Sequence, residues 1–453
     1  MVVALIAGAY YGSKLAAVGT AFTAKTLCSG VFVSHRDSAS VLGTDLSPDI
    51  HPILHIIGAR TDRDARAVTA SLFGLVERKA TYRDGFGCVV VDQNGSVARA
   101  ATLAVEPAPK PAEQPVAPDD LRITGEPSPE VDVAVLRSAV DWAFSEPDSG
   151  LPRNTRAVLV VHDGRIVAER YAEGFHEDTP LIGWSMTKSV VNALVGILVR
   201  EGKLSLDAPA PIPEWVGLDD PRRRITVANL LHMNSGLEFE EKYSNPLADV
   251  TYMLFGVPGA AQFAVAKPLL AEPGTRWSYS SGTSNILTHA IRHAVGEKDH
   301  PSFPRRALFD RIAMSSAVME TDATGTFVGS SFMYATARDW ARFGLLYLQD
   351  GVWSGTRILP EGWVDFSRSP APGAPDGKFG AHFWLRIPDE FRCGADTPDL
   401  PADAFHAVGH EGQFVTVVPS QKLVLVRLGS TRYPCGWNHQ TFVQRVVTSV
   451  SNR

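Results

Sequence analysis

The stretch WSMTKSVVNALVGILVREG at residues 184–202 decides how the rest of the chain is interpreted. Its spacing of apolar side chains predicts a long helix that is fully buried along Val190 to Val199. Ser185 and Lys188 lie three positions apart at the start of this helix, so their side chains share one face. The helix dipole favours an alkoxide on the serine, and desolvation lowers the pKa of the lysine. The pattern predicts a nucleophile with its general base; the alternative is a helix-start serine beside a solvated lysine.

Segments typical of β-strands lie on both sides of a largely helical middle. Residues 157–161 and 166–171 are β-rich and are separated by Asp163-Gly164, a dipeptide typical of a hairpin turn. Residues 414–418 and 423–428 have the same character near the end of the chain. Helical spacing occurs at residues 131–145, 226–233, 283–295, 335–349 and 438–450. We therefore expect an α+β fold in which one antiparallel sheet, built from both ends of this region, carries a mostly helical insertion.

A proline-rich segment divides the chain. Residues 105–130 contain seven prolines and almost no large apolar side chain, which predicts an extended connector. We expect four parts: an apolar N-terminal helix over residues 1–27, an N-terminal extension over 28–104, the connector over 105–130 and a large domain over 131–453 that holds Ser185 and Lys188. Within the extension, β-like runs at residues 31–33 and 87–92 flank a middle, residues 62–79, that we expect to be more helical.

The apolar start of the chain, residues 2–24, has two interpretations. It is long enough to span a bilayer as a membrane anchor, although Lys14 is costly near the middle of such a span. The alternative is a buried or surface-lying helix. The stretch is a poor signal peptide, because no basic residue precedes it and no A-x-A site follows it. An anchored or exported chain favours the bacterial periplasm or a membrane-associated location, with the cytoplasm as the alternative.

Composition excludes several classes of protein. The 453-residue chain has 43 Lys and Arg against 49 Asp and Glu, and it has no long basic run, which argues against general nucleic-acid binding. An apolar fraction of 45% excludes a mainly disordered chain. None of the 4 cysteines forms a CxxC pair, which leaves a structural zinc site without support. The cysteines allow three disulfide pairings, of which Cys28–Cys88 with Cys393–Cys435 is one, and the sequence does not choose among them.

Two further segments carry groups suited to catalysis. Tyr279 lies in PGTRWSYSS, residues 273–281, where its phenol could relay protons if a cationic Lys188 lowered its pKa. The segment GHEGQ, residues 409–413, precedes a strand, and a backbone N–H there would complete an oxyanion hole with the N–H of Ser185. The alternatives are a packed tyrosine and a surface turn. A Ser-His-Asp triad through His410 has no G-x-S-x-G elbow to support it.

Taken in order, these segments resemble one family. The blocks are SMTKS, LLHMNSGL at residues 230–237, PGTRWSYSS, YATARDWARFG at residues 334–344, and GHEGQF. They are similar to the serine β-lactamase-like hydrolases, in particular class C β-lactamases, related esterases and 6-aminohexanoate-dimer hydrolases, over roughly residues 130–450. The resemblance implies a β-lactamase/transpeptidase-like fold and an acyl-enzyme on Ser185. Lys188 and Tyr279 would share the acid and base work, the N–H groups of Ser185 and Gln413 would bind the oxyanion, and no metal or organic cofactor would be required.

Departures from the family pattern concern the substrate. Class C β-lactamases have Y-x-N, whereas Ser281 stands in the third position here. They also have K-T-G, whereas this chain has His410-Glu411-Gly412, and the missing lysine removes a partner for a β-lactam carboxylate. The segment EEKYSNP, residues 240–246, resembles the loop of 6-aminohexanoate-dimer hydrolases that carries a substrate-contacting tyrosine. That residue would be Tyr243, with an exposed loop aromatic as the alternative.

The sequence therefore predicts a serine hydrolase that cleaves a small-molecule amide or ester, similar to 6-aminohexanoate-dimer hydrolase. The alternatives are a carboxylesterase, a D-amino-acid peptidase, a weak class C-type β-lactamase and, outside enzymes, a membrane-anchored ligand-binding relative. Membrane association through residues 2–24 and a homodimer are further alternatives, and the oligomeric state is left open. The predicted catalytic residues are Ser185, Lys188 and Tyr279, and the predicted oxyanion or substrate contacts are Gln413, Tyr243, Ser281, His410 and Gly412.

Overall fold

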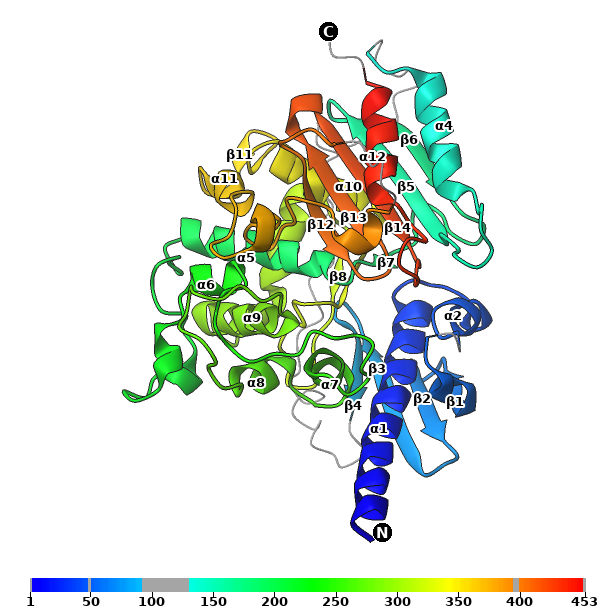
Figure 1. Ribbon diagram of the computed structural model, residues 1–453, viewed down its shortest axis with the longest axis vertical. Coiled ribbons are helices and arrows are strands. Elements are labelled where there is room, and N and C mark those ends of the chain that lie inside the picture. The colour runs from blue at the N-terminus through cyan, green and yellow to red at the C-terminus, as the bar shows by residue number, and fades with distance from the viewer. Residues whose placement is uncertain (1, 48–49, 92–129, 394–398, 451–453) are drawn as a thin grey trace.

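A computed structural model describes residues 2–47, 50–91, 130–393 and 399–450 of the protein (Figure 1). Its largest sheet has five antiparallel strands in the order β12-β13-β14-β5-β6. The strands are β5 (Thr155–His162), β6 (Arg165–Tyr171), β12 (Phe405–Gly409), β13 (Gln413–Val418) and β14 (Leu423–Gly429). The predicted sheet from both ends of the hydrolase region is confirmed, with Asp163 and Gly164 both at positive φ in the β5–β6 turn. The edge strand β12 was not predicted.

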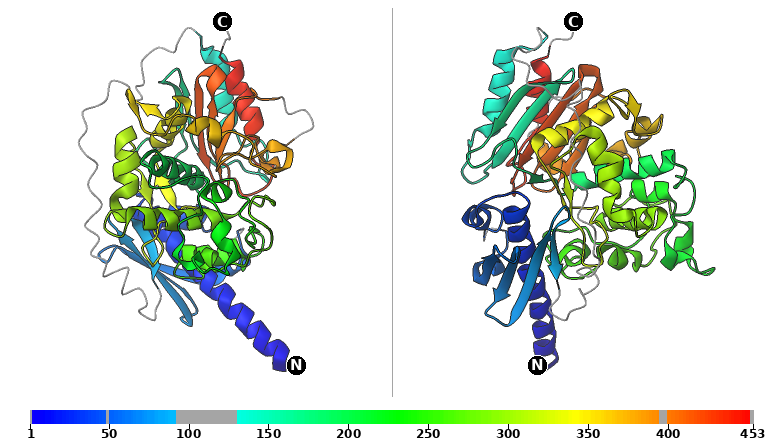
Figure 2. Two further views of the ribbon diagram at one scale, coloured as in Figure 1. Left: turned by 90° about the vertical axis from the view of Figure 1, so that its left-hand side faces the viewer. Right: turned by 180° about the vertical axis from the view of Figure 1, so that it is seen from behind.

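Helices cover both faces of this sheet. Helices α4 (Val133–Phe144) and α12 (His439–Thr448) lie side by side on one face, as Figure 2 shows. Helix α10 (Ala337–Leu348) packs against β13, β14 and β5 on the other face. Gly344 allows the close contact of α10 with the sheet, because a Cβ there would lie 2.5 Å from a methyl of Val424. The sheet is thus buried on both sides.

A mostly helical region is inserted between β6 and β12. Its elements are α5 (Met186–Arg200), α6 (Val227–Leu231), α7 (Asp249–Phe255), α8 (Ala260–Val265), α9 (Ser281–Val295) and α11 (Trp363–Ser367), with the short strands β7 (Leu181–Ile182), β8 (Val318–Met319), β9 (Met333–Ala335), β10 (Val352–Trp353) and β11 (Thr356–Arg357). Helix α5 corresponds to the predicted helix at residues 184–202. Every residue from Met186 to Leu198 is buried, so this helix forms the centre of the hydrolase domain.

The N-terminal residues form a helix-and-sheet unit. Helix α1 (Val2–Phe32) is followed by α2 (Ser38–Thr44), the 3₁₀ helix η1 (Pro52–Ile56) and a four-stranded antiparallel sheet of β1 (Ile57–Asp62), β2 (Ala67–Leu72), β3 (Val76–Arg83) and β4 (Gly87–Val91). The expected strand at residues 31–33 is wrong, since α1 runs through Phe32. The expected helical middle at 62–79 is also wrong. Phe73 and Gly74 both have positive φ and close a hairpin there.

Helix α1 is the hydrophobic centre of this unit. Its residues from about Ala16 onward are mostly buried, and they pack against β2, β3 and β4. The stretch Tyr10–Phe32 is long and apolar enough to cross a membrane, but 72% of that window is buried inside the protein. The fold therefore supports the buried-helix interpretation for this stretch, and membrane association through residues 2–24 stays a prediction. The proposed connector lies outside the described residues except for Glu130.

Two disulfides fasten the ends of the described chain. Cys28 on α1 is bonded to Cys88 on β4, and Cys393 is bonded to Cys435 in the segment before α12. Of the three pairings that the sequence allows, this is the one in the structure. The first disulfide ties α1 to the N-terminal sheet.

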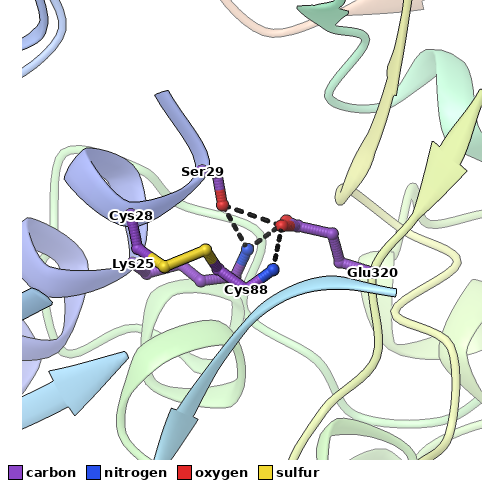
Figure 3. Close-up of a disulfide and its surroundings, with 5 residues drawn as sticks. All are labelled: Lys25, Cys28, Ser29, Cys88 and Glu320. Atoms are coloured by element: carbon purple, nitrogen blue, oxygen red, sulfur yellow. Dashed lines mark hydrogen bonds and ion pairs between the residues drawn. A yellow bond between two sulfur atoms is a disulfide. The ribbon is translucent and has the colours of Figure 1, made fainter. Parts of the chain in front are cut away.

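A buried ion pair joins this N-terminal unit to the hydrolase domain (Figure 3). Lys25 on α1 pairs with Glu320, which follows β8, and the Glu320 side chain is 0% exposed. The other Glu320 oxygen accepts hydrogen bonds from Ser29 Oγ at 2.8 Å and from the Cys88 N–H at 2.6 Å. A buried carboxylate needs such a complete set of donors. Glu320 is thus the point at which α1, β4 and the hydrolase domain meet.

We expect Glu320→Ala to lower the free energy of unfolding by about 3–5 kcal/mol, because it leaves the Lys25 ammonium buried without its anion. Urea unfolding followed by circular dichroism measures this loss. Glu297→Ala is the matched control: Glu297 pairs with Arg292, but its side chain is 70% exposed, so a loss of about 0–1 kcal/mol is expected. Equal losses in the two variants would contradict the central position of Glu320.

Candidate active site

Ser185 occupies the N-cap position of α5, directly after a tightly packed turn. Its side chain makes no capping hydrogen bond to the helix, which leaves the hydroxyl available for other contacts. Gly183 lies under Trp340, where a Cβ would be 2.3 Å from the indole. Trp184 has a φ of 46°, an uncommon conformation for a bulky residue. The backbone is therefore locally strained directly before the serine.

The Lys188 amine lies one turn further along α5 and is surrounded by three oxygens. Lys188 Nζ is 2.8 Å from Ser185 Oγ, 3.1 Å from Ser281 Oγ and 2.9 Å from the carbonyl oxygen of Ser330. The Ser330 segment is held by Asn285, whose side chain bonds both its hydroxyl and its N–H. The predicted contact between the serine and the lysine is thus present, and the Ser330 carbonyl is a neighbour that the sequence did not indicate.

Burial sets the protonation of this amine. Lys188 is 2% exposed, and desolvation lowers its pKa to about 8, while the Glu241 carboxylate opposes that shift. A neutral amine has two hydrogens and one lone pair. Two N–H groups can be donated to Ser281 Oγ and the Ser330 carbonyl, and the lone pair then faces Ser185 Oγ. The three oxygens can accept the three N–H groups of the ammonium, and loss of one proton leaves a lone pair directed at Ser185 Oγ.

Glu241 belongs to the site, although sequence reasoning did not select it. Its carboxylate accepts hydrogen bonds from Ser281 Oγ at 2.6 Å and from the Ser281 N–H at 2.8 Å, at the start of α9. Ser281, which stands at the position of the family Asn, thereby connects Glu241 to Lys188. The Tyr243 hydroxyl also donates to Glu241, at 3.1 Å. The one available signal was the acidic pair at residues 240–241, two positions before the tyrosine.

Tyr279 lies beside the serine and the lysine. Its hydroxyl is close enough to Ser185 to affect the pKa of the phenol, and its ring centroid is 5.1 Å from Lys188 Nζ. The expectation of a lowered pKa is wrong, because burial and the Glu241 charge raise the pKa of Tyr279 above its ordinary value. The phenol is therefore protonated at neutral pH. In that state it suits proton donation better than proton abstraction.

The GHEGQ segment forms the turn between β12 and β13. Because β12 is the outer strand, Gln413 on β13 lies one strand behind the edge, where it is paired in register with Gly409. Gly409 lies against the Gly183 carbonyl, two residues before Ser185. The Gln413 side chain holds the turn through the carbonyls of His410 and Gly429. The Gln413 N–H as oxyanion donor stays a prediction, and the sheet order makes the N–H groups at the end of β12 the alternative.

Two of the predicted substrate contacts, Tyr243 and His410, form an aromatic wall together with Trp184, the residue before Ser185. The His410 ring stacks on Tyr243 at 4.8 Å and meets Trp184 edge to face at 5.8 Å. Tyr243 is 43% exposed, as expected for a loop residue that a substrate can reach. Gly412 leaves room for the Arg427 guanidinium, since a Cβ at this position would lie 2.5 Å from it. Its predicted contact with substrate stays a prediction.

The described residues contain no group of three or more His, Cys, Asp or Glu side chains arranged to hold a metal ion. The polar groups around Ser185 are hydroxyls, an amine, a phenol and one carboxylate. This set suits proton transfer and nucleophilic attack.

Comparison with known proteins gives consistent matches. The family model described as Beta-lactamase matches residues 152–441. The 6-aminohexanoate-dimer hydrolase of Paenarthrobacter ureafaciens is 27% identical over 301 residues, which cover 61% of this chain and 72% of that enzyme. The structure of a family VIII carboxylesterase has a TM-score of 0.55 at 16% identity, covering 73% of this chain and 100% of the other. A class C beta-lactamase in complex with cefoxitin has a TM-score of 0.52 at 14% identity, covering 71% and 100%.

We expect Glu241→Gln to shift the pH dependence of kcat/KM to lower pH. If Lys188 acts as the base, activity rises with pH through its pKa and then reaches a plateau. Glu241 raises that pKa, so removing the negative charge lowers it and moves the rising limb toward acid. A pH profile with p-nitrophenyl acetate measures the midpoint. Glu240→Gln, the same charge change at the exposed neighbouring residue, serves as the control. A shift toward alkaline pH in Glu241→Gln would contradict the assignment.

Proposed function

Because this chain belongs to the Beta-lactamase family and is a serine hydrolase, we propose that it cleaves a small-molecule amide or ester through an acyl-enzyme on Ser185. The observation that carries the proposal is the buried Lys188 amine, whose pKa lies near 8 and which is 2.8 Å from Ser185 Oγ. A nucleophile and a base in hydrogen-bonding contact are the geometric requirement for such catalysis.

Acylation begins when neutral Lys188 accepts the Ser185 proton as Oγ attacks the substrate carbonyl carbon. The carbonyl becomes a tetrahedral oxyanion, which the Ser185 N–H at the positive end of α5 stabilises. The β12–β13 turn supplies a second N–H. The sequence motif indicates the backbone N–H of Gln413 for this task, and the strand order indicates the backbone N–H of His410 as the alternative. Backbone donors fixed at a strand end need no rearrangement during the reaction, which supports this arrangement.

The oxyanion then collapses and the carbon–heteroatom bond breaks. The Tyr279 phenol gives its proton to the departing amine or alkoxide and recovers one from the Lys188 ammonium. The serine proton is thus transferred to the leaving group, and the acyl group remains on Ser185. Water attacks this ester next, its proton passes to Ser185 Oγ through the same groups, and the free acid leaves.

The groups near the serine favour linear amides and esters over β-lactams. Glu411 stands where K-T-G enzymes carry a neutral residue beside a lysine, and it is held by Ser430 Oγ at 3.0 Å and by Arg432 at 3.5 Å. This carboxylate is already paired with Arg432, so a β-lactam carboxylate at this position lacks the cationic partner that the family lysine provides. The relative from Paenarthrobacter ureafaciens, by its name, hydrolyses a 6-aminohexanoate dimer. We therefore propose a linear amide or ester as the substrate class.

We expect Ser185→Ala to lower kcat by roughly 10⁴-fold or more, because the acyl-enzyme can no longer form. Covalent labelling by a fluorophosphonate probe, read by intact-protein mass, measures the loss directly. Ser189→Ala removes a buried hydroxyl one turn further along the same helix, and it should still be labelled. A Ser185→Ala protein that turns over substrate normally would refute the proposal.

A substrate panel tests the class of bond. We expect turnover of p-nitrophenyl acetate and of a linear 6-aminohexanoate dimer at rates well above that of nitrocefin, since the site has no lysine for a β-lactam carboxylate. The measurement is kcat/KM for each compound with the same enzyme preparation. A dominant activity on nitrocefin would overturn the preference for linear substrates and favour a β-lactamase.

A further inference from the structure

A cavity of about 230 Å³ lies where the N-terminal unit meets the hydrolase domain. We propose that it is a binding subsite for the aliphatic chain of the substrate, on one side of the bond that Ser185 cleaves. The inference rests on the proposed function and adds the substrate class. It concerns residues of α1 and η1, which precede the region matched by the family model, so it is a property of this chain's own architecture.

The cavity adjoins the catalytic serine. Trp184, the residue before Ser185, lines it, and so do His410 and Tyr243 of the aromatic wall. Tyr243 is also bonded to Glu241, which reaches Lys188 through Ser281. Ser185 itself does not line the cavity, so a chain attached to a carbonyl there would enter it past this aromatic wall.

The walls suit an apolar occupant. Helix α1 contributes Leu15, Val18 and Phe22, η1 contributes Ile53 and Leu54, and α7 contributes Leu254 and Phe255. The volume is below the roughly 300–1,000 Å³ typical of pockets for drug-sized ligands, which favours a slender chain over a bulky ring system. Each methylene that leaves water for such a wall strengthens binding by about fourfold.

One corner of the cavity is charged. Arg36 and Arg156 both pair with Asp45, at 2.6 and 2.8 Å, so two guanidinium groups share one carboxylate. Arg36 is buried, and among the described residues its Nε has no hydrogen-bond partner. This cluster carries one uncompensated positive charge, whereas the two other charged side chains of the lining, Lys25 and Glu411, are paired with Glu320 and Arg432. A chain that ends in a carboxylate is therefore accepted, and one that ends in an ammonium group is disfavoured.

The test compares esters of increasing chain length. Hydrolysis of p-nitrophenyl acetate, butanoate, hexanoate and octanoate reports the acyl side, and acetates of ethanol to octanol report the leaving-group side. We expect kcat/KM to rise with chain length, by roughly tenfold or more overall, in one of the two series. A flat or falling trend in both series, with p-nitrophenyl acetate still hydrolysed and Ser185 still labelled, would overturn the subsite while leaving the proposed function intact.

A matched pair of variants ties the effect to the cavity. Leu54→Trp fills the cavity from η1 and should reduce the preference for the longest over the shortest ester by about tenfold. Ile56→Trp makes the same kind of change on the same 3₁₀ helix at a residue that is 48% exposed and outside the lining, and it should keep the wild-type preference. Equal preferences in the two variants would refute the assignment.

The charged corner is tested with chains of equal length. We expect the mono-p-nitrophenyl ester of adipic acid to be hydrolysed several-fold more efficiently than p-nitrophenyl 6-aminohexanoate, and the ratio to fall as salt is added. If instead the leaving-group series is the one that responds, the same comparison is made with acetate esters of ω-hydroxy acids and ω-amino alcohols. An equal or reversed preference would overturn the role of the Arg36–Asp45–Arg156 corner.

Discussion

The contact between the Lys188 amine and Ser185 Oγ is the interaction on which the rest of the site depends. Burial of the lysine in α5 lowers its pKa to about 8, which corresponds to about 3 kcal/mol in favour of the neutral amine. In that state two of the surrounding oxygens can accept the two N–H groups, which leaves the lone pair for the serine proton. The apolar core around α5 is therefore part of the catalytic chemistry as well as of the fold.

Local sequence patterns were sufficient for most of this arrangement. The S-x-x-K spacing, the apolar run of α5 and the Asp163-Gly164 turn each act over a few residues, and the structure has the corresponding helix, contact and hairpin. What the sequence did not reveal depends on contacts between distant segments. Glu241 reaches Ser281 across 40 positions, and the edge strand β12 is recognisable only once the strand order is known. The raised pKa of Tyr279 likewise follows from burial and a distant carboxylate.

The structure of the N-terminal unit also could not be predicted from local sequence patterns alone. An apolar stretch of more than twenty residues fits a membrane span or the core helix of a small domain equally well, because both remove the helix from water. Which of the two structures forms depends on what surrounds the helix. In this protein the four-stranded sheet β1–β4 packs against it. Residues 62–79 were expected to be more helical, yet the alternation of more and less exposed positions at the start of β3 and the turn at Phe73-Gly74 belong to a hairpin.

The buried Lys25–Glu320 pair explains how this unit can take part in substrate recognition. Apolar packing alone is not directional, so α1 could slide along the sheet at modest cost. A shift by one helical turn would leave Lys25 and Glu320 buried without each other, which is far more costly than lost packing. The ion pair and the Cys28–Cys88 disulfide therefore fix the position of α1 along its axis. The side chains one to two turns before Lys25, Val18 and Phe22, are held against the cavity beside Trp184 as a consequence. A wall fixed in this way can discriminate between chains by length, whereas a sliding one cannot.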